Sequence, residues 1–179
     1  MINRIKKYIP DSIKGAGKDV LNKLEYRKIM AEQKEAGIRK INIGSGTDRR
    51  PGFLNIDIEE SVKPDIVRDI EKGLPFDDNS VDEIYCSHTL EHVNDLLFVI
   101  REFYRVLKNS AKLTIVVPLM DPSDMTHVRF FNDHTFRTMT EEEYWTSSYY
   151  FVGKYKELSR SKRQLSTCEE LTVEFEVIK

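Results

Sequence analysis

The residues best suited to chemistry lie in a glycine turn and at the end of the apolar stretch that follows it. Residues 41–48 read INIGSGTD, and residues 55–58 read NIDI. Glycines at a strand end let a ligand approach the backbone because no Cβ intervenes. A carboxylate at the tip of the next strand, here Asp57, can accept both hydroxyl protons of a ribose. The pattern predicts a nucleotide-cofactor site, although an aspartate at such a position could also merely cap a loop.

Three further polar stretches follow the glycine turn at strand and loop positions. Residues 65–70 read DIVRDI, residues 74–84 read LPFDDNSVDEI and residues 87–93 read SHTLEHV. Together with the glycine turn, they resemble the class I S-adenosylmethionine-dependent methyltransferases, in particular the methyltransferase type 11-like members. The resemblance is close over residues 38–118 and extends to the remainder by element order.

This resemblance implies an enzyme, a methyltransferase with S-adenosylmethionine as its cofactor. By motif position, Gly44 and Gly46 would line the amino-acid end of the cofactor, Asp57 would hold its ribose, and Asp69 with the Ile70 backbone would meet its adenine. Ser87 and His88 would face the methionine part or the methyl acceptor. The implied cofactor-binding residues are Gly44, Ser45, Gly46, Asp57, Ile58, Asp69, Ile70 and Ser87.

Two residues depart from the family pattern, and the first connection is short. Asn42 stands where an acidic residue often precedes the turn, and Asp48 stands where a third glycine is common. Only residues 47–54 separate the first two strands, which is too few for a crossover helix, so we expect a single turn or a bare loop. A dinucleotide site is disfavoured because Arg49 replaces the third glycine of its Gly-x-Gly-x-x-Gly turn.

The candidate acceptor-binding residues follow the fifth predicted strand, where α/β sheets place ligand-contacting loops. His127 could be a general base for a hydroxyl acceptor, and Arg129 could grip a carboxylate or phosphate. His88 joins them as a candidate, so the catalytic candidates are His127 and His88. The candidate substrate-binding residues are His88, His127 and Arg129.

Two arrangements of potential metal ligands also occur. Residues 88–92 read HTLEH and match a zinc-peptidase pattern, which requires a helix and a third ligand. Here the pattern straddles a predicted strand end, and we expect no metal there. Asp121, Asp124 and His127 could bind a divalent cation, although a solvated loop is the simpler interpretation.

Hydrophobic patterning predicts an α/β fold. The expected strands are 38–43, 53–58, 65–67, 81–86 and 113–117, with a helix over 94–107 and another running from about 132 into 140–143. Segments 149–158 and 171–178 predict an antiparallel hairpin at a sheet edge, joined by a polar loop. The family resemblance makes this a doubly wound, mainly parallel, seven-stranded Rossmann-like sheet with a methyltransferase-like domain over residues 38–179.

Residues 1–37 form a predicted basic helical extension. Residues 1–40 hold 11 Lys/Arg against 5 Asp/Glu, or +6, and the remaining 17 against 25 give −8. A basic amphipathic helix could contact an anionic membrane peripherally, or the segment could be a solvated helix pair packed on the domain. The acidic body argues against a nucleic-acid partner, although a nucleic-acid methyltransferase using the basic segment stays an alternative.

Composition bounds the remaining possibilities. The 179 residues suit one domain, and 40% apolar with 32% charged residues is a globular balance. Two cysteines make no disulfide framework, and no apolar run reaches the roughly 20 residues of a membrane span, so we expect a cytoplasmic protein. The resemblance suggests a small-molecule acceptor, such as a sugar or glycolipid precursor. A non-catalytic binding module is the other alternative, and oligomeric state is not predicted.

Overall fold

The computed structural model describes residues 28, 31, 39–121 and 124–179. Contacts divide the chain into two units, Met1–Gly37 and Ile38–Lys179. The predicted basic extension and its membrane contact fall in the first unit, outside the described residues apart from Lys28 and Ala31. They stay predictions, and the second unit is described below.

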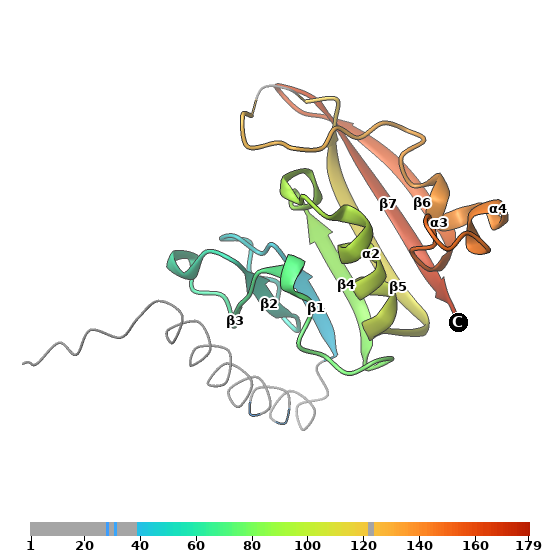
Figure 1. The fold of residues 1–179 in the computed structure, drawn as a ribbon. Coiled ribbons are helices and arrows are strands. Elements are labelled where there is room, and N and C mark those ends of the chain that lie inside the picture. Colours follow the sequence, from blue (N-terminus) through green and yellow to red (C-terminus); the bar gives the residue numbers. More distant parts are fainter. Residues whose placement is uncertain (1–27, 29–30, 32–38, 122–123) are drawn as a thin grey trace, which may run out of the picture. The chain divides into compact units, whose positions relative to one another are not determined.

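The second unit is built on one seven-stranded sheet of order β3-β2-β1-β4-β5-β7-β6 (Figure 1). Neighbouring strands from β3 to β5 pair in parallel, whereas β7 is antiparallel to both β5 and β6. This confirms the predicted mainly parallel α/β sheet with an antiparallel carboxyl-terminal hairpin. The strands are β1 (Lys40–Ile43), β2 (Leu54–Asp57), β3 (Ile66–Val67), β4 (Val81–Ser87), β5 (Leu107–Leu119), β6 (Lys154–Gln164) and β7 (Glu169–Ile178).

The core lies on one face of this sheet. Strand register aligns Ile41, Ile84, Leu113 and Phe175 in a row across four strands, and each is at most 2% exposed. Side chains two residues apart on a strand share a face, so these rows repeat along each strand and form a continuous apolar layer. Burying each such side chain contributes about 1.5–3 kcal/mol.

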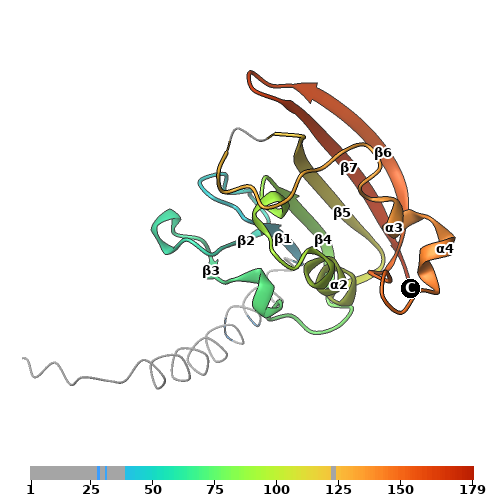
Figure 2. The ribbon, with the colours of Figure 1, turned by 45° about the horizontal axis from the view of Figure 1, so that its top comes forward.

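Helix α2 (Leu96–Val106) covers this face over β4 and β5 (Figures 1 and 2). It buries Val99, Ile100, Phe103 and Val106, a spacing that places them on one stripe of a helix. The helix begins where the Asp95 carboxylate accepts a hydrogen bond from the Phe98 amide, 3.0 Å away. Among the described residues, no helix has the length and apolar character of a membrane span.

The connection from β1 to β2 contains turns and bends but no helix, which confirms the expected loop. A buried amide network holds it in place. The Asn42 side-chain amide donates to the Asp48 carbonyl oxygen (2.8 Å) and to Asn55 Oδ1 (3.0 Å). Asn55 Oδ1 also accepts from the Arg50 amide, and Asn55 Nδ2 donates to Asp65 Oδ2 at 2.9 Å. Side-chain hydrogen bonds therefore hold the connection between β1 and β2 in place, where other α/β folds use a packed crossover helix.

The remaining short elements differ from the predictions at several boundaries. The segment expected as one helix or two from about residue 132 forms two, and the first begins at 137 because the Asn132 side chain accepts from the His134 amide and closes a turn instead. The polar segment 159–164, expected as a loop, extends β6, an edge strand with ion pairs on its exposed side. These elements are α3 (Arg137–Thr140), α4 (Glu142–Trp145), and the 3-10 turns η1 (Glu60–Val62), η2 (Ile70–Lys72) and η3 (Leu90–His92).

The buried amide network makes a prediction about Asn42, which is 2% exposed. Asn42→Asp replaces a double donor with an anion that faces two acceptors, so the free energy of unfolding at pH 7 should fall by about 2–4 kcal/mol. Urea unfolding measures this, with the exposed Asn79→Asp as a matched control expected within about 0.5 kcal/mol of wild type. The deficit should shrink at acidic pH, where the protonated carboxyl can donate again. An Asn42→Asp protein as stable as wild type at pH 7 would contradict this account of the loop.

Candidate functional site

The carboxyl ends of the parallel strands bring the predicted cofactor residues to one edge of the sheet. The glycine turn follows β1, Asp57 ends β2, Asp69 follows β3, and Ser87 ends β4. Parallel strands of an open α/β sheet point their carboxyl ends to the same edge, which is where ligands of this architecture bind. The tertiary structure thus gathers positions that are more than 40 residues apart in sequence.

Gly44 is required by close packing as well as by its backbone conformation. Its φ is +63°, and a Cβ at this position would lie 1.9 Å from Thr89 Oγ1. That hydroxyl donates to the carbonyl oxygens of Ser87 (2.9 Å) and Ile43 (3.3 Å). The contact therefore locks the turn after β1 to the loop after β4. Thr89 was not predicted from the sequence.

Asp57 and Gly46 form the next part of the edge. The Gly46 amide donates to Asp57 Oδ2 at 2.7 Å, and the Glu59 amide donates to Oδ1 at 2.8 Å. Each carboxylate oxygen has two lone-pair sites, so this carboxylate can accept two further hydrogen bonds, as a ribose diol would require. Apart from Gly46 and its two chain neighbours, no described residue has an atom within 4 Å of the position that a Cβ of Gly46 would take, so this side of the turn is open in the described part of the chain.

Ser45 carries a buried hydroxyl with no hydrogen-bond partner among the described residues. The residue is only 4% exposed, and its backbone amide donates to the Ile56 carbonyl. A buried hydroxyl without a partner costs free energy that a bound polar ligand would recover. The open turn, the Asp57 carboxylate and this hydroxyl fit a nucleoside ligand with an amino-acid end.

The far end of the edge is formed by Asp69 and Ile70. The Asp69 side chain accepts from the Glu71 amide at 3.0 Å and contacts Lys72 Nζ at 3.2 Å, which makes it the cap of η2. Ile70 is buried, whereas Ile58, which follows the adjacent strand β2, is 68% exposed. The loop-capping interpretation and the adenine-binding interpretation of Asp69 are compatible, because its carboxylate retains further acceptor capacity.

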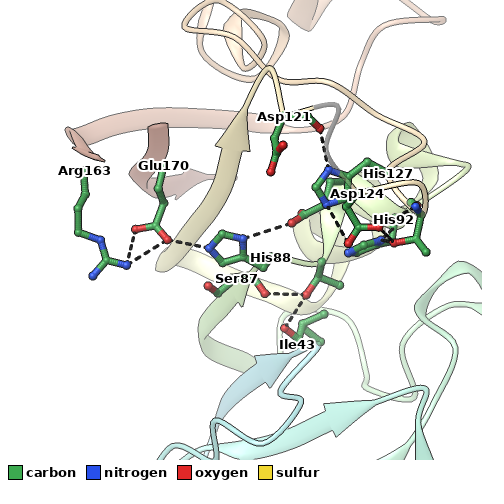
Figure 3. A network of polar contacts seen from close by, with 12 residues as sticks. Ile43, Ser87, His88, His92, Asp121, Asp124, His127, Arg163 and Glu170 are labelled. Carbon is green, nitrogen blue, oxygen red and sulfur yellow. Dashed lines mark hydrogen bonds and ion pairs between the residues drawn. The ribbon is translucent and has the colours of Figure 1, made fainter. Parts of the chain in front are cut away.

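His88 lies between two carboxylates at the carboxyl end of β4. Its Nε2 is 2.7 Å from Glu170 Oε2 (Figure 3), and its Nδ1 is 3.4 Å from Glu91 Oε1. Glu91 and then Glu170 raise the pKa of His88 to about 9 against the opposing effect of burial. The imidazole is therefore protonated at neutral pH, so it can donate a proton or bind an anion but does not act as a base.

Glu170 connects this histidine to the edge hairpin. Its burial alone would raise the pKa of the carboxyl, but hydrogen bonds from His88 and Arg163 outweigh this and lower the pKa. Glu170 lies on β7, which pairs with β5, and it is 82 residues from His88 in sequence. No sequence signal pointed to it, because its partner is brought near only by strand pairing.

The loop after β5 supplies His127, as predicted. His127 Nδ1 lies 3.0 Å from the Asp121 carbonyl oxygen, and its ring packs edge-on against His92 with centroids 5.0 Å apart (Figure 3). Arg129 has a positioning role that the sequence did not predict, because its guanidinium donates to the backbone carbonyls of Val93 and Asn94. The amides of Val128 and Arg129 both donate to the Glu91 carbonyl, which fixes this loop on η3.

Comparison with known proteins agrees with the resemblance drawn from the sequence. Residues 37–115, less than half of the chain, match the family described as "Methyltransferase domain". The sheet is shared with solved structures of S-adenosylmethionine-dependent methyltransferases. A segment of 60 residues is 42% identical to the uncharacterized protein MJ0638 of Methanocaldococcus jannaschii. That segment covers 34% of this chain and only 25% of the relative.

Solved structures share the fold at low sequence identity. A SAM-dependent methyltransferase of Methanosarcina mazei aligns with a TM-score of 0.60 and 14% identity over 78% of this chain and 92% of its own. A possible histamine N-methyltransferase of Thermotoga maritima aligns with a TM-score of 0.55 and 17% identity, over 78% of this chain and 82% of its own. A third structure is the W203A mutant of the 16S rRNA (adenine(1408)-N(1))-methyltransferase of Catenulisporales acidiphilia with cosubstrate SAM. It aligns with a TM-score of 0.53 and 13% identity, over 78% of this chain and 84% of its own.

The packing of Gly44 on Thr89 is testable by matched glycine variants. Gly52→Ala carries only the cost of a positive φ, about 1–2 kcal/mol, because its Cβ would meet no atom within 4 Å. Gly44→Ala should cost more than this, because its Cβ would also overlap the Thr89 side chain. In a Thr89→Gly background the additional cost should largely disappear, as measured by a double-mutant cycle of urea unfolding. Equal costs for Gly44→Ala and Gly52→Ala would show that the contact is not tight.

The charge of His88 is testable by NMR titration of the metal-free protein in EDTA. Its ring proton should titrate near pH 9, and Glu170→Gln should move the midpoint down, whereas Glu174→Gln on the same strand should not. Because the folded pKa is raised above about 6.5, the stability contributed by this group is present below pH 6.5 and lost as pH rises through 9. A wild-type midpoint near 6.5 would contradict the ion-pair geometry.

Proposed function

We propose that this chain is an S-adenosylmethionine-dependent methyltransferase that methylates a hydroxyl group of a small molecule, with sugars and glycolipid precursors as the acceptor class. The observation that best supports cofactor binding is the open glycine turn beside Asp57, where the buried Ser45 hydroxyl has no hydrogen-bond partner among the described residues. The methyltransferases that the chain resembles use this edge of the sheet for their cofactor, and the residues present fit it.

Named residues would hold the cofactor. Asp57 would accept from the ribose hydroxyls, the Gly44–Gly46 turn would line the amino-acid end, and Asp69 with the Ile70 backbone would meet the adenine. When bound, the cofactor supplies a methyl group already activated by its sulfonium. Asn42 cannot take the role of the acidic residue common in the family, because its amide donates to Asp48 and Asn55.

The acceptor side supports a hydroxyl nucleophile. A backbone carbonyl can only accept, so the contact with Asp121 places the proton of neutral His127 on Nδ1 and leaves a lone pair on Nε2. That nitrogen can take a proton from an acceptor hydroxyl, which must lose it as the methyl bond forms. His88, protonated between Glu91 and Glu170, would hold these two carboxylates in place beside the acceptor. Alignment of the acceptor with the methyl group and exclusion of water would supply most of the rate.

Two observations favour a second candidate, a nucleic-acid acceptor. A solved structure with this fold is an rRNA methyltransferase, and residues 1–40 carry a charge of +6. The −8 of the remaining residues opposes contact with phosphates. A partner-binding module that has lost catalysis is the third candidate, and it differs from the other two by failing to bind the cofactor.

Calorimetric titration tests cofactor binding. The wild-type chain should bind S-adenosylmethionine and S-adenosylhomocysteine with one site per chain, and Asp57→Ala should weaken both by at least about tenfold, the loss of roughly 1.4 kcal/mol. Asp82→Asn, which removes a charge at the opposite end of β4, is the matched control and should bind as wild type. Circular dichroism establishes that each variant is folded. Absence of cofactor binding by the folded wild-type chain would contradict the proposed function and favour the partner-binding module.

Transfer of a labelled methyl group then separates the acceptor classes. Pools of sugars, nucleotide sugars and glycolipids are compared with RNA and DNA at several salt concentrations. Label on a sugar or glycolipid hydroxyl supports the proposal. Label on nucleic acid, with activity that falls steeply as salt rises, would instead establish the second candidate.

A further inference from the structure

A cluster of potential metal ligands lies beside the acceptor side of the site, and the proposed function does not use it as a whole. Glu91, His92 and His127 each offer one ligand atom, and these atoms lie within 4.8 Å of one another. Glu91 and His92 belong to η3, whereas His127 comes from the loop after β5. The set differs from both arrangements noted in the sequence: it omits His88 of the HTLEH motif, and it omits Asp121 and Asp124.

The Glu91 carboxylate lacks the hydrogen bonds that a buried anion requires. The side chain is 1% exposed, and neither of its oxygens has a hydrogen-bond partner among the described residues. Its ion pair with His88 is long, at 3.4 Å, and the same imidazolium is held more closely by Glu170, at 2.7 Å. A buried carboxylate with such weak compensation is costly, and a bound cation would remove that cost.

Both histidines are oriented as metal ligands are. His92 Nδ1 lies 3.2 Å from the Thr126 carbonyl and 3.1 Å from the Thr126 hydroxyl, whose own proton is donated to Asp124 at 2.6 Å. His127 Nδ1 lies 3.0 Å from the Asp121 carbonyl. These partners accept only, so each neutral ring carries its proton on Nδ1 and presents an Nε2 lone pair. A backbone carbonyl on the other ring nitrogen is the usual support of a metal-binding histidine.

We infer that Glu91, His92 and His127 bind a divalent transition-metal ion, with Zn²⁺ as the best fit. Two imidazoles and one carboxylate suit Zn²⁺ and its neighbours, whereas Mg²⁺ and Ca²⁺ prefer oxygen ligands only. Ligands about 2.0 Å from a tetrahedral zinc are about 3.3 Å apart. The present spread is larger, so binding draws the exposed ring of His92 inward. Three protein ligands leave a fourth position for water or a ligand oxygen.

The inferred ion would join two parts of the acceptor side. It would bridge η3 to the loop after β5, which already meet through the hydrogen bonds of Val128 and Arg129 to the Glu91 carbonyl. The inference rests on these ligands alone and does not depend on the proposed methyl transfer. With metal bound, His127 Nε2 would be a ligand and no longer a base, so the two roles of this nitrogen exclude each other.

Metal binding is tested on the full chain after removal of any affinity tag and dialysis against EDTA. Titration with Zn²⁺, followed by calorimetry and by elemental analysis after gel filtration, should give one ion per chain. Co²⁺ should develop the visible absorption bands of a site with nitrogen ligands, and Mg²⁺ should neither bind nor displace Zn²⁺. Zn²⁺ should also raise the melting temperature, because only the folded chain presents the three ligands together.

Variants assign the ligands. His92→Ala changes an exposed residue and should weaken Zn²⁺ binding at least about tenfold, with His127→Ala at least as harmful. His134→Ala, which changes an exposed histidine outside the cluster, is the matched control and should bind as wild type. Absence of Zn²⁺ binding, or binding that persists in His92→Ala/His127→Ala, would overturn the inference. Cofactor titration repeated in EDTA separates this result from the proposed function, because the cofactor residues are not ligands.

Discussion

The contact between Gly44 and Thr89 is the constraint on which the site depends. A side chain of any size at residue 44 would overlap Thr89, and the Thr89 hydroxyl in turn binds the carbonyls of Ile43 and Ser87. The end of β1 and the end of β4 are thereby held in one fixed geometry. The glycine turn and Ser87 lie at the ends of these two strands, Asp57 ends β2, which pairs with β1, and His127 follows β5, which pairs with β4. The precision of the site therefore comes from backbone packing before any ligand is bound.

The short first connection shows how this chain builds the fold without a crossover helix between its first two strands. The amides of Asn42 and Asn55 carry the hydrogen bonds that hold the loop, and they do so from buried positions where such bonds are strongest. The departure at residue 42 then has a structural reason. Asn42 donates two hydrogen bonds, which an acidic side chain cannot do, and one of them goes to the backbone carbonyl oxygen of Asp48.

The acceptor side is governed by buried charge. Glu170 and Glu91 share the single imidazolium of His88, and the contact of Glu91 is the longer one, at 3.4 Å against 2.7 Å. Two more histidines present lone pairs close to Glu91, with their Nδ1 protons held by backbone carbonyls or a hydroxyl. This arrangement of one buried carboxylate and two histidine lone pairs is suited to proton transfer and to metal binding. The same nitrogen of His127 serves either purpose, and the ligand bound beside it decides which.

The sequence by itself determined the sheet, the glycine turn and the position of Asp57 at a strand end, and it carried the resemblance to methyltransferases. These depend on local patterns: β-branched runs, paired glycines, and motifs read within a few residues. The positions of Asp69, His88 and His127 at strand ends followed from the same reasoning. Thr89, Glu91 and Glu170 acquired their roles only in the tertiary structure. Thr89 meets Gly44 after β1, Glu170 meets His88 after β4, and Glu91 meets His127 from the loop after β5, so no local spacing encodes these contacts. The length of β6 and the late start of α3 were likewise decided by ion pairs and by the Asn132 turn, which compete with intrinsic propensity and become visible only when the chain is folded.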